Sequence, residues 1–477
     1  EDIAFIDNMT GFWSGGSFSE IDMDSCRTSA LIKGTFTLTR HTFKGGIEFK
    51  DNSLDGYVQG KFLARYSPFS YLQYLTLVDS QVRNRNLAAF LQDSWKIHSR
   101  LRLNLGIRWE GQYLYGSDNK LAQSITGQFQ PRLGFVFLTK KDGTQRLFGS
   151  AGRFYHDIST WFSLQHFVDG TISESKYYDH DPRIDPSGGM TFVQVGFKSP
   201  HVDGLIGQHF DEFTLGYELE LFGTHKLGVR GIYRVLREGI EDAEDPATRR
   251  IVYGNPGRGS LQDYPEIHRG YTALELTLQK IQTGPFNYFA SYVYSKNQGN
   301  YPGLFNADRN QKRPNADLFF NKLDAILNYL PEFEGLLPND RTHVFKLSGW
   351  YNFPFGLNAG AFILWQSGTP LNEFGGLYPV QPWQILLVPR GSAGRTPSVF
   401  DLSLRFTYQF AAISEQFRNT RLVLDIFHVG SQRTPVNYEQ VHFFNRDMNG
   451  NQINPNPNYG LASRYYPPMS VRLGFEV

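Results

Sequence analysis

The stretch LRLNLGIRWEG at residues 101–111 alternates between apolar and polar side chains almost without fault. Successive side chains of a β-strand point to opposite faces of its sheet. One face would therefore carry Leu101, Leu103, Leu105, Ile107 and Trp109, and the other Arg102, Asn104, Gly106, Arg108 and Glu110. In a soluble sheet the apolar face meets a protein core, whereas in an outer-membrane barrel it meets lipid. What covers this face decides the fold.

The amino-acid composition does not exclude a membrane barrel. Of the 477 residues 40% are hydrophobic, the mean hydropathy is −0.39, and no run of about 18 apolar residues predicts a transmembrane helix. Barrel strands have low average hydropathy because they alternate. Aromatic residues reach 15%, as the interfacial girdles of barrels favour. A formal net charge of +1 gives no reason to expect a nucleic-acid partner, and the lone Cys26 excludes an intramolecular disulfide.

The same alternation recurs along the chain, in FTLGYELELFG (213–223), FDLSLRFTYQ (400–409) and MSVRLGFEV (469–477). It predicts an all-β fold, a transmembrane antiparallel β-barrel with about 17 strands in this chain. The predicted strands are 29–40, 43–52, 56–66, 70–80, 86–97, 101–115, 127–139, 145–157, 208–222, 225–239, 267–281, 285–297, 341–353, 356–368, 398–409, 419–432 and 469–477.

The connections between these strands alternate in length. Short Gly-, Pro- and Asp-containing turns, such as KKDGT and FGTH, are typical of tight hairpins. Long loops separate the hairpins and are predicted at 158–207, 240–266, 298–340, 369–397 and 433–468. Outer-membrane barrels show this asymmetry, with short periplasmic turns and long extracellular loops. A sandwich or a propeller would not produce it so regularly.

An odd number of strands is unusual for a bacterial single-chain barrel. We therefore expect this chain to be the C-terminal part of a larger barrel, with an irregular segment at 1–28 and barrel sequence at 29–477.

Several stretches resemble the Oar-like TonB-dependent receptors. Phe90, Gln92, Asp93 and Trp95, followed by the strand around Leu103 to Arg108, match two consecutive strands of that family. Further similar motifs occur in QPRLGFVF, LFGSAGRFYHD, DRTHVFKLSGWYNFPFG, WQSGTP and LDIFHVGSQRTP. The resemblance implies a 22-stranded barrel that imports bulky nutrients with energy from TonB. It also implies a globular plug domain, which would precede residue 1 here.

The polar faces are the main candidate functional surface. If the alternation is interpreted correctly, the lumen-lining residues are Arg102, Arg108, Glu110, Arg132, Glu218, Glu220, Arg230 and Arg405. They would contact a plug or a passing polar solute. The plainer interpretation is that they form the ion pairs and hydrated wall that any wide barrel requires. The lipid-facing residues are Leu101, Leu103, Leu105, Ile107 and Trp109.

Two loops raise other hypotheses. Asp179, His180, Asp181 and Asp185 form an acidic cluster that calcium could use, but Asp-Pro pairs are also ordinary turn formers, and we predict no metal site. Apolar residues recur every three or four positions over 318–330, which predicts a short amphipathic helix ended by Pro331. That helix would be a lid, a docking surface or simply a packed part of the loops.

No catalytic or cofactor-binding motif occurs in the sequence, so we expect neither an enzyme nor a bound cofactor. The leading hypothesis is a TonB-dependent receptor barrel of a Gram-negative outer membrane, whose partners are lipid, a plug, TonB and extracellular or periplasmic proteins. A rival is a structural barrel that anchors an extracellular or envelope protein assembly. A soluble β-rich binding protein is a third hypothesis, and solubility without detergent would favour it.

Overall fold

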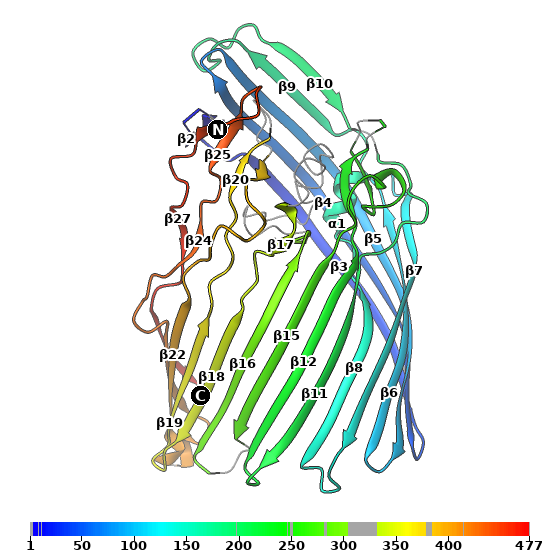
Figure 1. Ribbon diagram of the computed structural model, residues 1–477, viewed down its shortest axis with the longest axis vertical. Helices are drawn as coiled ribbons and strands as arrows, with labels where there is room; N and C mark the ends of the chain where they lie inside the picture. The colour runs from blue at the N-terminus through cyan, green and yellow to red at the C-terminus, as the bar shows by residue number, and fades with distance from the viewer. Residues whose placement is uncertain are drawn as a thin grey trace.

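A computed structural model describes residues 3–476 except 8, 11, 197, 246, 249–250, 281–283, 304–331, 378–383 and 414. One large sheet dominates the structure, and this sheet curves from one strand to the next (Figure 1). Fifteen strands of this sheet pair with one another consecutively and antiparallel. They are β3 (Ser19–Thr37), β4 (His41–Ser67), β5 (Ser70–His98), β6 (Leu101–Tyr115), β7 (Leu121–Leu138), β8 (Gln145–Tyr155), β11 (His209–Leu221), β12 (His225–Glu238), β15 (Arg269–Lys280), β16 (Phe286–Gly299), β18 (His343–Asn352), β19 (Leu357–Gln366), β22 (Val399–Gln409), β23 (Arg421–Phe427) and β28 (Ser470–Glu476).

The shorter elements lie mainly between these strands. Five of them belong to the large sheet, namely β1 (Ala4–Asp7), β2 (Phe12–Ser14), β9 (Ile172–Tyr178), β10 (Met190–Val195) and β17 (Gly335–Leu336). The others are the α-helix α1 (Thr160–His166), the 3₁₀ helices η1 (Gly259–Leu261), η3 (Phe410–Ala412) and η4 (Glu415–Phe417), and the strands of small hairpins. These strands are β13 (Glu241–Glu244), β14 (Ile251–Gly254), β20 (Phe374–Gly376), β21 (Gln384–Leu386), β24 (Pro435–Tyr438), β25 (Phe443–Arg446), β26 (Gln452–Pro455) and β27 (Ala462–Tyr465). None of the helices in the described ranges is long and apolar enough to cross a membrane.

The two ends of the sheet differ as the connection lengths predict. Turns such as those between β5 and β6, and between β11 and β12, gather at the lower end in Figure 1. The long connections, with α1 and the small hairpins, gather at the upper end. The N-terminal residues lie toward the upper end and the C-terminal residues toward the lower end. The fold is therefore that of an outer-membrane β-barrel, with short turns at one end and long, structured connections at the other.

The predicted number of strands is wrong in one region. The strands predicted at 43–52 and 56–66 form the single strand β4, and those at 70–80 and 86–97 form the single strand β5. The stretch 51–56 reads as a turn because it is polar and contains Gly56, but it stays in register with β5, with Asp55 opposite Gln81. Alternation breaks there because the apolar positions move to the other face of β4, where Leu54 and Val58 are buried against Leu164 and Val168.

This extension builds an outer sheet beyond the barrel wall. β4 and β5 have 27 and 29 residues, whereas a tilted strand crosses a bilayer with about 9–11. Residues 62–65 of β4 pair in parallel with β1, and residues 71–77 of β5 pair with β9, which also pairs with β10.

The N-terminal region differs from the prediction as well. The segment predicted as irregular, 1–28, contains β1, β2 and the first ten residues of β3. β3 pairs only with β4, and β28 pairs only with β23, among the residues that the structure describes. The odd number of predicted strands implies that the whole barrel has further strands, and this stays a prediction.

Candidate functional site: the polar face and the outer loops

The two faces of β6 and β7 have different chemistry. Leu103 lies opposite Phe135, and Leu105 lies opposite Leu133. These side chains share the face predicted to meet lipid. All five predicted lipid-facing residues are exposed or half-buried, and they are Leu101, Leu103, Leu105, Ile107 and Trp109. On the other face Glu110 is only 5% exposed. Exposed apolar side chains on one face, with a carboxylate buried on the opposite face, are the reverse of a soluble protein's arrangement.

Ion pairs within a strand and across strands hold five of the eight predicted polar residues. Arg108 Nη2 lies 2.8 Å from Glu48 Oε2 and 3.1 Å from Glu110 Oε2. Arg132 donates a hydrogen bond to Gln130 Oε1 at 3.2 Å. The structure thus brings Arg108 and Glu110 together as parts of one network.

The remaining predicted residues are distributed around the sheet. Glu218 pairs with Arg146 and Lys226, at 2.6 and 2.9 Å, and Arg230 pairs with Glu275 at 2.6 Å. Arg102 and Glu220 form no ion pair within the described part of the chain. The eight predicted residues therefore do not converge on one centre. Their assignment to a lumen stays a prediction.

Sequence reasoning missed the partners of these residues. Glu48, Arg146, Glu275 and Asp425 pair with predicted residues across strands. Arg230 lies opposite Glu275 in the strand register, and Arg405 lies opposite Asp425. Directly opposed residues of opposite charge stabilise a sheet. The register would have identified Arg146, Glu275 and Asp425, but alternation alone gives only the face.

A hollow of about 430 Å³ lies on this face between β18, β19, β22 and β23. We call it the wall hollow, and its lining includes Ser348, Trp350, Phe362, Arg405 and Asp425. Arg405 Nε lies 2.5 Å from Asp425 Oδ1, and Arg472 Nη2 lies 2.6 Å from Asp425 Oδ2. The Asp425 side chain is only 3% exposed. The lining arginine therefore already has a carboxylate partner.

A second hollow, of about 310 Å³, lies past the outer ends of β18 and β19. We call it the outer cavity. Its lining includes Arg341, Gln366, Gln440, Arg464 and Tyr466. Gln366 follows Asn358 and Phe362 on β19 at even spacing, so the outer cavity opens on the same face as the wall hollow.

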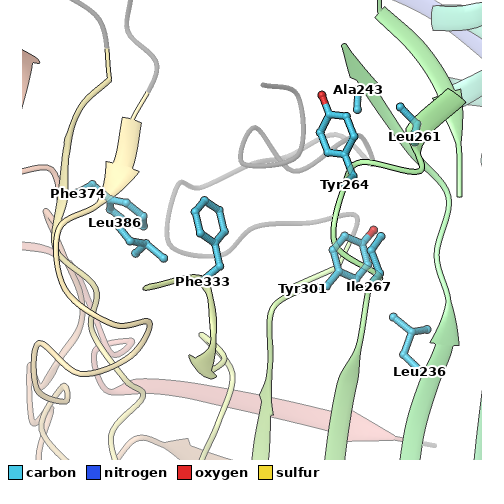
Figure 2. Close-up of a cluster of buried hydrophobic side chains, with 9 residues drawn as sticks. All are labelled: Leu236, Ala243, Leu261, Tyr264, Ile267, Tyr301, Phe333, Phe374 and Leu386. Atoms are coloured by element: carbon cyan, nitrogen blue, oxygen red, sulfur yellow. The ribbon is translucent and has the colours of Figure 1, made fainter. Parts of the chain in front are cut away.

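The outer loops pack into defined hydrophobic clusters. Figure 2 shows one of them, in which side chains from separate loops are buried together. Its members are Leu236, Ala243, Leu261, Tyr264, Ile267, Tyr301, Phe333, Phe374 and Leu386. The loops are thus a folded layer, which is consistent with the burial of apolar surface away from lipid.

A second cluster encloses two titratable groups. Phe162, Phe167 and Tyr253 surround His166, whose Nε2 lies 4.0 Å from Asp242 Oδ2. Burial lowers the pKa of His166 to about 4 and raises the pKa of Asp242 to about 6. Burial also raises the pKa of Tyr253, whose hydroxyl donates to Gln123 Oε1. Both His166 and Asp242 favour their neutral forms at pH 5.

The acidic side chains at 179–185 already pair with basic side chains of the same segment. Asp179 lies 2.6 Å from His180, and Asp181 lies 2.6 Å from Arg183. The described residues contain no group of three or more His, Cys, Asp or Glu side chains that could hold a metal ion. The amphipathic helix predicted at 318–330 lies outside the described residues.

Comparison with known proteins agrees with this architecture. Residues 12–146 match the family described as outer membrane beta barrel domain. The TonB-dependent transporter Oar of Myxococcus xanthus is 26% identical over 94% of this chain. The chain spans 47% of that relative's length.

Solved structures share the fold at low sequence identity. The outer membrane transporter YddB from Escherichia coli has a TM-score of 0.57 and 12% identity, covering all of this chain and 58% of that one. The FrpB iron transporter from Neisseria meningitidis has a TM-score of 0.51 and 10% identity, covering 95% and 64%. These relatives are transport proteins rather than enzymes. Family, strands and relatives together place the chain in the bacterial outer membrane.

Proposed function

We propose that this chain, an outer-membrane β-barrel related in sequence to a TonB-dependent transporter, is the C-terminal part of a transporter barrel and passes a bulky solute. The observation that carries the proposal is the contrast between the two faces. Apolar side chains such as Leu105 and Ile107 are exposed, at 39% and 50%, whereas polar side chains such as Glu110 and Asp425 are buried. A barrel with lipid outside and a hydrated lumen inside explains why apolar side chains are exposed on one face and why polar side chains gather on the other.

The lumen wall in this proposal consists of the paired charges. Arg108, Glu218, Arg230 and Arg405 each have a partner of opposite charge. Such a wall is polar but has little net charge, so it suits passage of a polar solute without holding it tightly. TonB and a plug are the partners that the relatives imply. We place the plug in the part of those relatives that this chain does not match.

The rival anchor function has an observation of its own. The outer sheet extends past the wall, and β10 exposes Met190, Phe192 and Val193, which are 54–64% exposed. Exposed apolar side chains on an edge strand are typical of a protein-binding surface. A surface assembly docked there would need the barrel only as support.

Cysteine labelling tests the assignment of the faces. In a Cys26→Ser background, we would compare Ser348→Cys with Leu347→Cys, because these neighbours on β18 point to opposite faces. A small water-soluble maleimide should modify the first variant in intact outer membranes and spare the second. Equal or reversed labelling would contradict a polar lumen.

Depletion of solutes from the growth medium tests transport itself. Cells that express the full-length protein would be compared with cells lacking it, each with TonB active or inactive. A solute removed only when both proteins are active supports transport. Unchanged solute levels, together with loss of a surface protein from cells lacking the barrel, would favour the anchor.

A further inference from the structure

The outer cavity has an unusual lining for this face of the sheet. Three chain segments build it, at 338–341, 366–371 and 436–466. Its charged lining residues are Arg341 and Arg464, and its lining contains neither Asp nor Glu. The cavity is therefore positively charged, in contrast to the balanced ion pairs elsewhere on the polar face.

Arg341 is half-buried without a carboxylate partner. Its Nη1 donates to the backbone oxygen of Ser367 at 2.5 Å, which satisfies a donor but leaves the positive charge unbalanced. Burial lowers the pKa of Arg341, and Arg395 nearby lowers it further, whereas Tyr466 opposes that shift. A guanidinium removed from water without an opposite charge costs free energy that a bound anion would offset.

Two carboxylates are already engaged, namely Asp340, the sequence neighbour of Arg341, and Asp401, which accepts a hydrogen bond from the lining Tyr466. Asp340 lies 2.5 Å from Arg395 Nη2 and is only 1% exposed. It also accepts a hydrogen bond from the backbone N–H of Asn297. Asp401 lies 2.9 Å from His428 Nδ1. No ion pair joins Arg341 or Arg464 to any residue in the described ranges.

Neutral lining residues add donors. Gln440 is 4% exposed, and its Oε1 accepts from the backbone N–H of Asn372 at 2.6 Å. That bond uses the carbonyl side of the amide, so the Nε2 group is left as a donor. Gln366 lines the cavity from the end of β19. The uncharged polar lining residues can donate as well as accept hydrogen bonds, and the only charged lining residues are the two arginines, as recognition of an oxyanion favours.

We propose that the outer cavity binds an oxyanion, a carboxylate or phosphate group, through Arg341 and Arg464. Arginine suits this ligand because its planar guanidinium can donate two parallel hydrogen bonds to such a group. The anion belongs either to a passing solute or to a lipopolysaccharide headgroup. The solute source rests on the proposed function, because it presumes that the polar face lines the passage.

Binding of defined anions by the purified full-length protein tests the proposal. Isothermal titration calorimetry in detergent would use inorganic phosphate and citrate, with glucose as an uncharged control. Arg341→Gln and Arg464→Gln should each weaken anion binding by about tenfold or more, because each removes charge-assisted hydrogen bonds. Arg405→Gln is the matched control, since that arginine has its partner in the wall hollow. It should change the affinity by less than about twofold.

Several outcomes would overturn the proposal. They are wild-type protein that binds neither anion, binding that survives both substitutions, and an equal loss with Arg405→Gln. Circular dichroism and heat-modifiable gel migration would verify that each variant is folded. Arg464 is exposed, so its variant stays informative if Arg341→Gln misfolds.

Mass spectrometry of the purified protein distinguishes the two sources of the anion. Co-purified lipopolysaccharide that disappears with Arg464→Gln identifies a headgroup, whereas binding of free anions by lipid-free protein identifies a solute group. Absence of both overturns the site. Because these measurements need no transport, failure of the anion site and failure of the proposed passage are distinguishable. The labelling of Ser348→Cys reports on the passage alone.

Discussion

The wall hollow and the outer cavity open on the same polar face, but their charges are balanced differently. In the wall hollow, Asp425 lies between Arg405 and Arg472 and pairs with both. In the outer cavity, Arg341 and Arg464 have no carboxylate on the lining. The wall arginines share a buried carboxylate, whereas arginines without such a partner are left for an anionic ligand. The position of arginine on a polar face is thus less informative than its partner.

The largest expected effect comes from the packing behind the outer cavity. Phe374 is fully buried, and its backbone N–H donates to Gln440, a lining residue of the cavity. Phe374→Ala should destabilise this loop layer by about 3–5 kcal/mol because it leaves a cavity among buried side chains. Hydrogen exchange at the amides of β20 and β25 measures the loss.

Phe355→Ala is the control for that variant, because Phe355 is 56% exposed in a short turn. Its effect should stay within about 0.5 kcal/mol. Phe374→Ala should also weaken anion binding. Unchanged anion affinity in a loosened loop layer would show that the outer cavity does not depend on this packing.

A charge on the apolar face tests the wall itself. Leu105→Arg should destabilise the barrel by about 2–4 kcal/mol, since arginine near the bilayer midplane must leave water. Asn104→Arg is the neighbouring change on the polar face and should cost less than about 1 kcal/mol. Urea unfolding in lipid bilayers compares them. Similar losses would mean that residues 104 and 105 do not face different solvents.

Alternation predicted the wall well because period two is a direct consequence of strand geometry. The strand predicted at 101–115 is β6, and the one at 225–239 differs from β12 by a single residue at its end. It failed at 43–66 and 70–97, where β4 and β5 continue into the outer sheet. There the buried Leu54 and Val58 lie on the opposite face of β4 from the exposed Ile47 and Phe49, so the apolar alternation changes face within the strand.

The outer cavity could not be predicted in the same way. Arg341, Gln440 and Arg464 are far apart in sequence, and they lie in connections and in the short strand β27, where no long alternation marks a face. Their meeting depends on how the loops pack, which no local pattern encodes. The ion partners of the wall residues depend on strand register. Sequence therefore predicted the two chemically different faces of the wall strands, but not the positions where charges meet.

Removing the shared carboxylate would make the wall hollow resemble the outer cavity. Asp425→Asn leaves Arg405 and Arg472 without a partner and should cost about 1–2 kcal/mol, because the arginines stay partly hydrated, at 55% and 63% exposure. The same variant should gain an anion site that titrates with inorganic phosphate. Calorimetry of Asp425→Asn in an Arg341→Gln background isolates the new site. Absence of added binding would mean that unpaired arginines alone do not make an anion site on this face.

The buried pair His166–Asp242 extends the comparison to pH. Between pH 6.5 and 4 the unfolded chain binds a proton at His166 that the folded loops exclude, so acidification weakens the fold. Asp242 acts in the opposite sense. Its pKa is raised to about 6, so between pH 6 and 4 the folded loops bind its proton more readily, and acidification strengthens the fold. In the native protein the two effects largely cancel between pH 6 and 4.

Asp242→Asn should separate these effects, with the smallest change at neutral pH. At pH 7 the variant should be as stable as the native protein or slightly more stable, because it no longer buries a charge. Between pH 6.5 and 4 it should lose loop stability steadily, since only His166 still titrates. Hydrogen exchange at the amides of α1, corrected for the intrinsic pH dependence of exchange, measures this. Asp203→Asn is the control, because Asp203 is fully exposed. A native-like, flat pH response of Asp242→Asn would mean that His166 does not stay neutral in the packed loops.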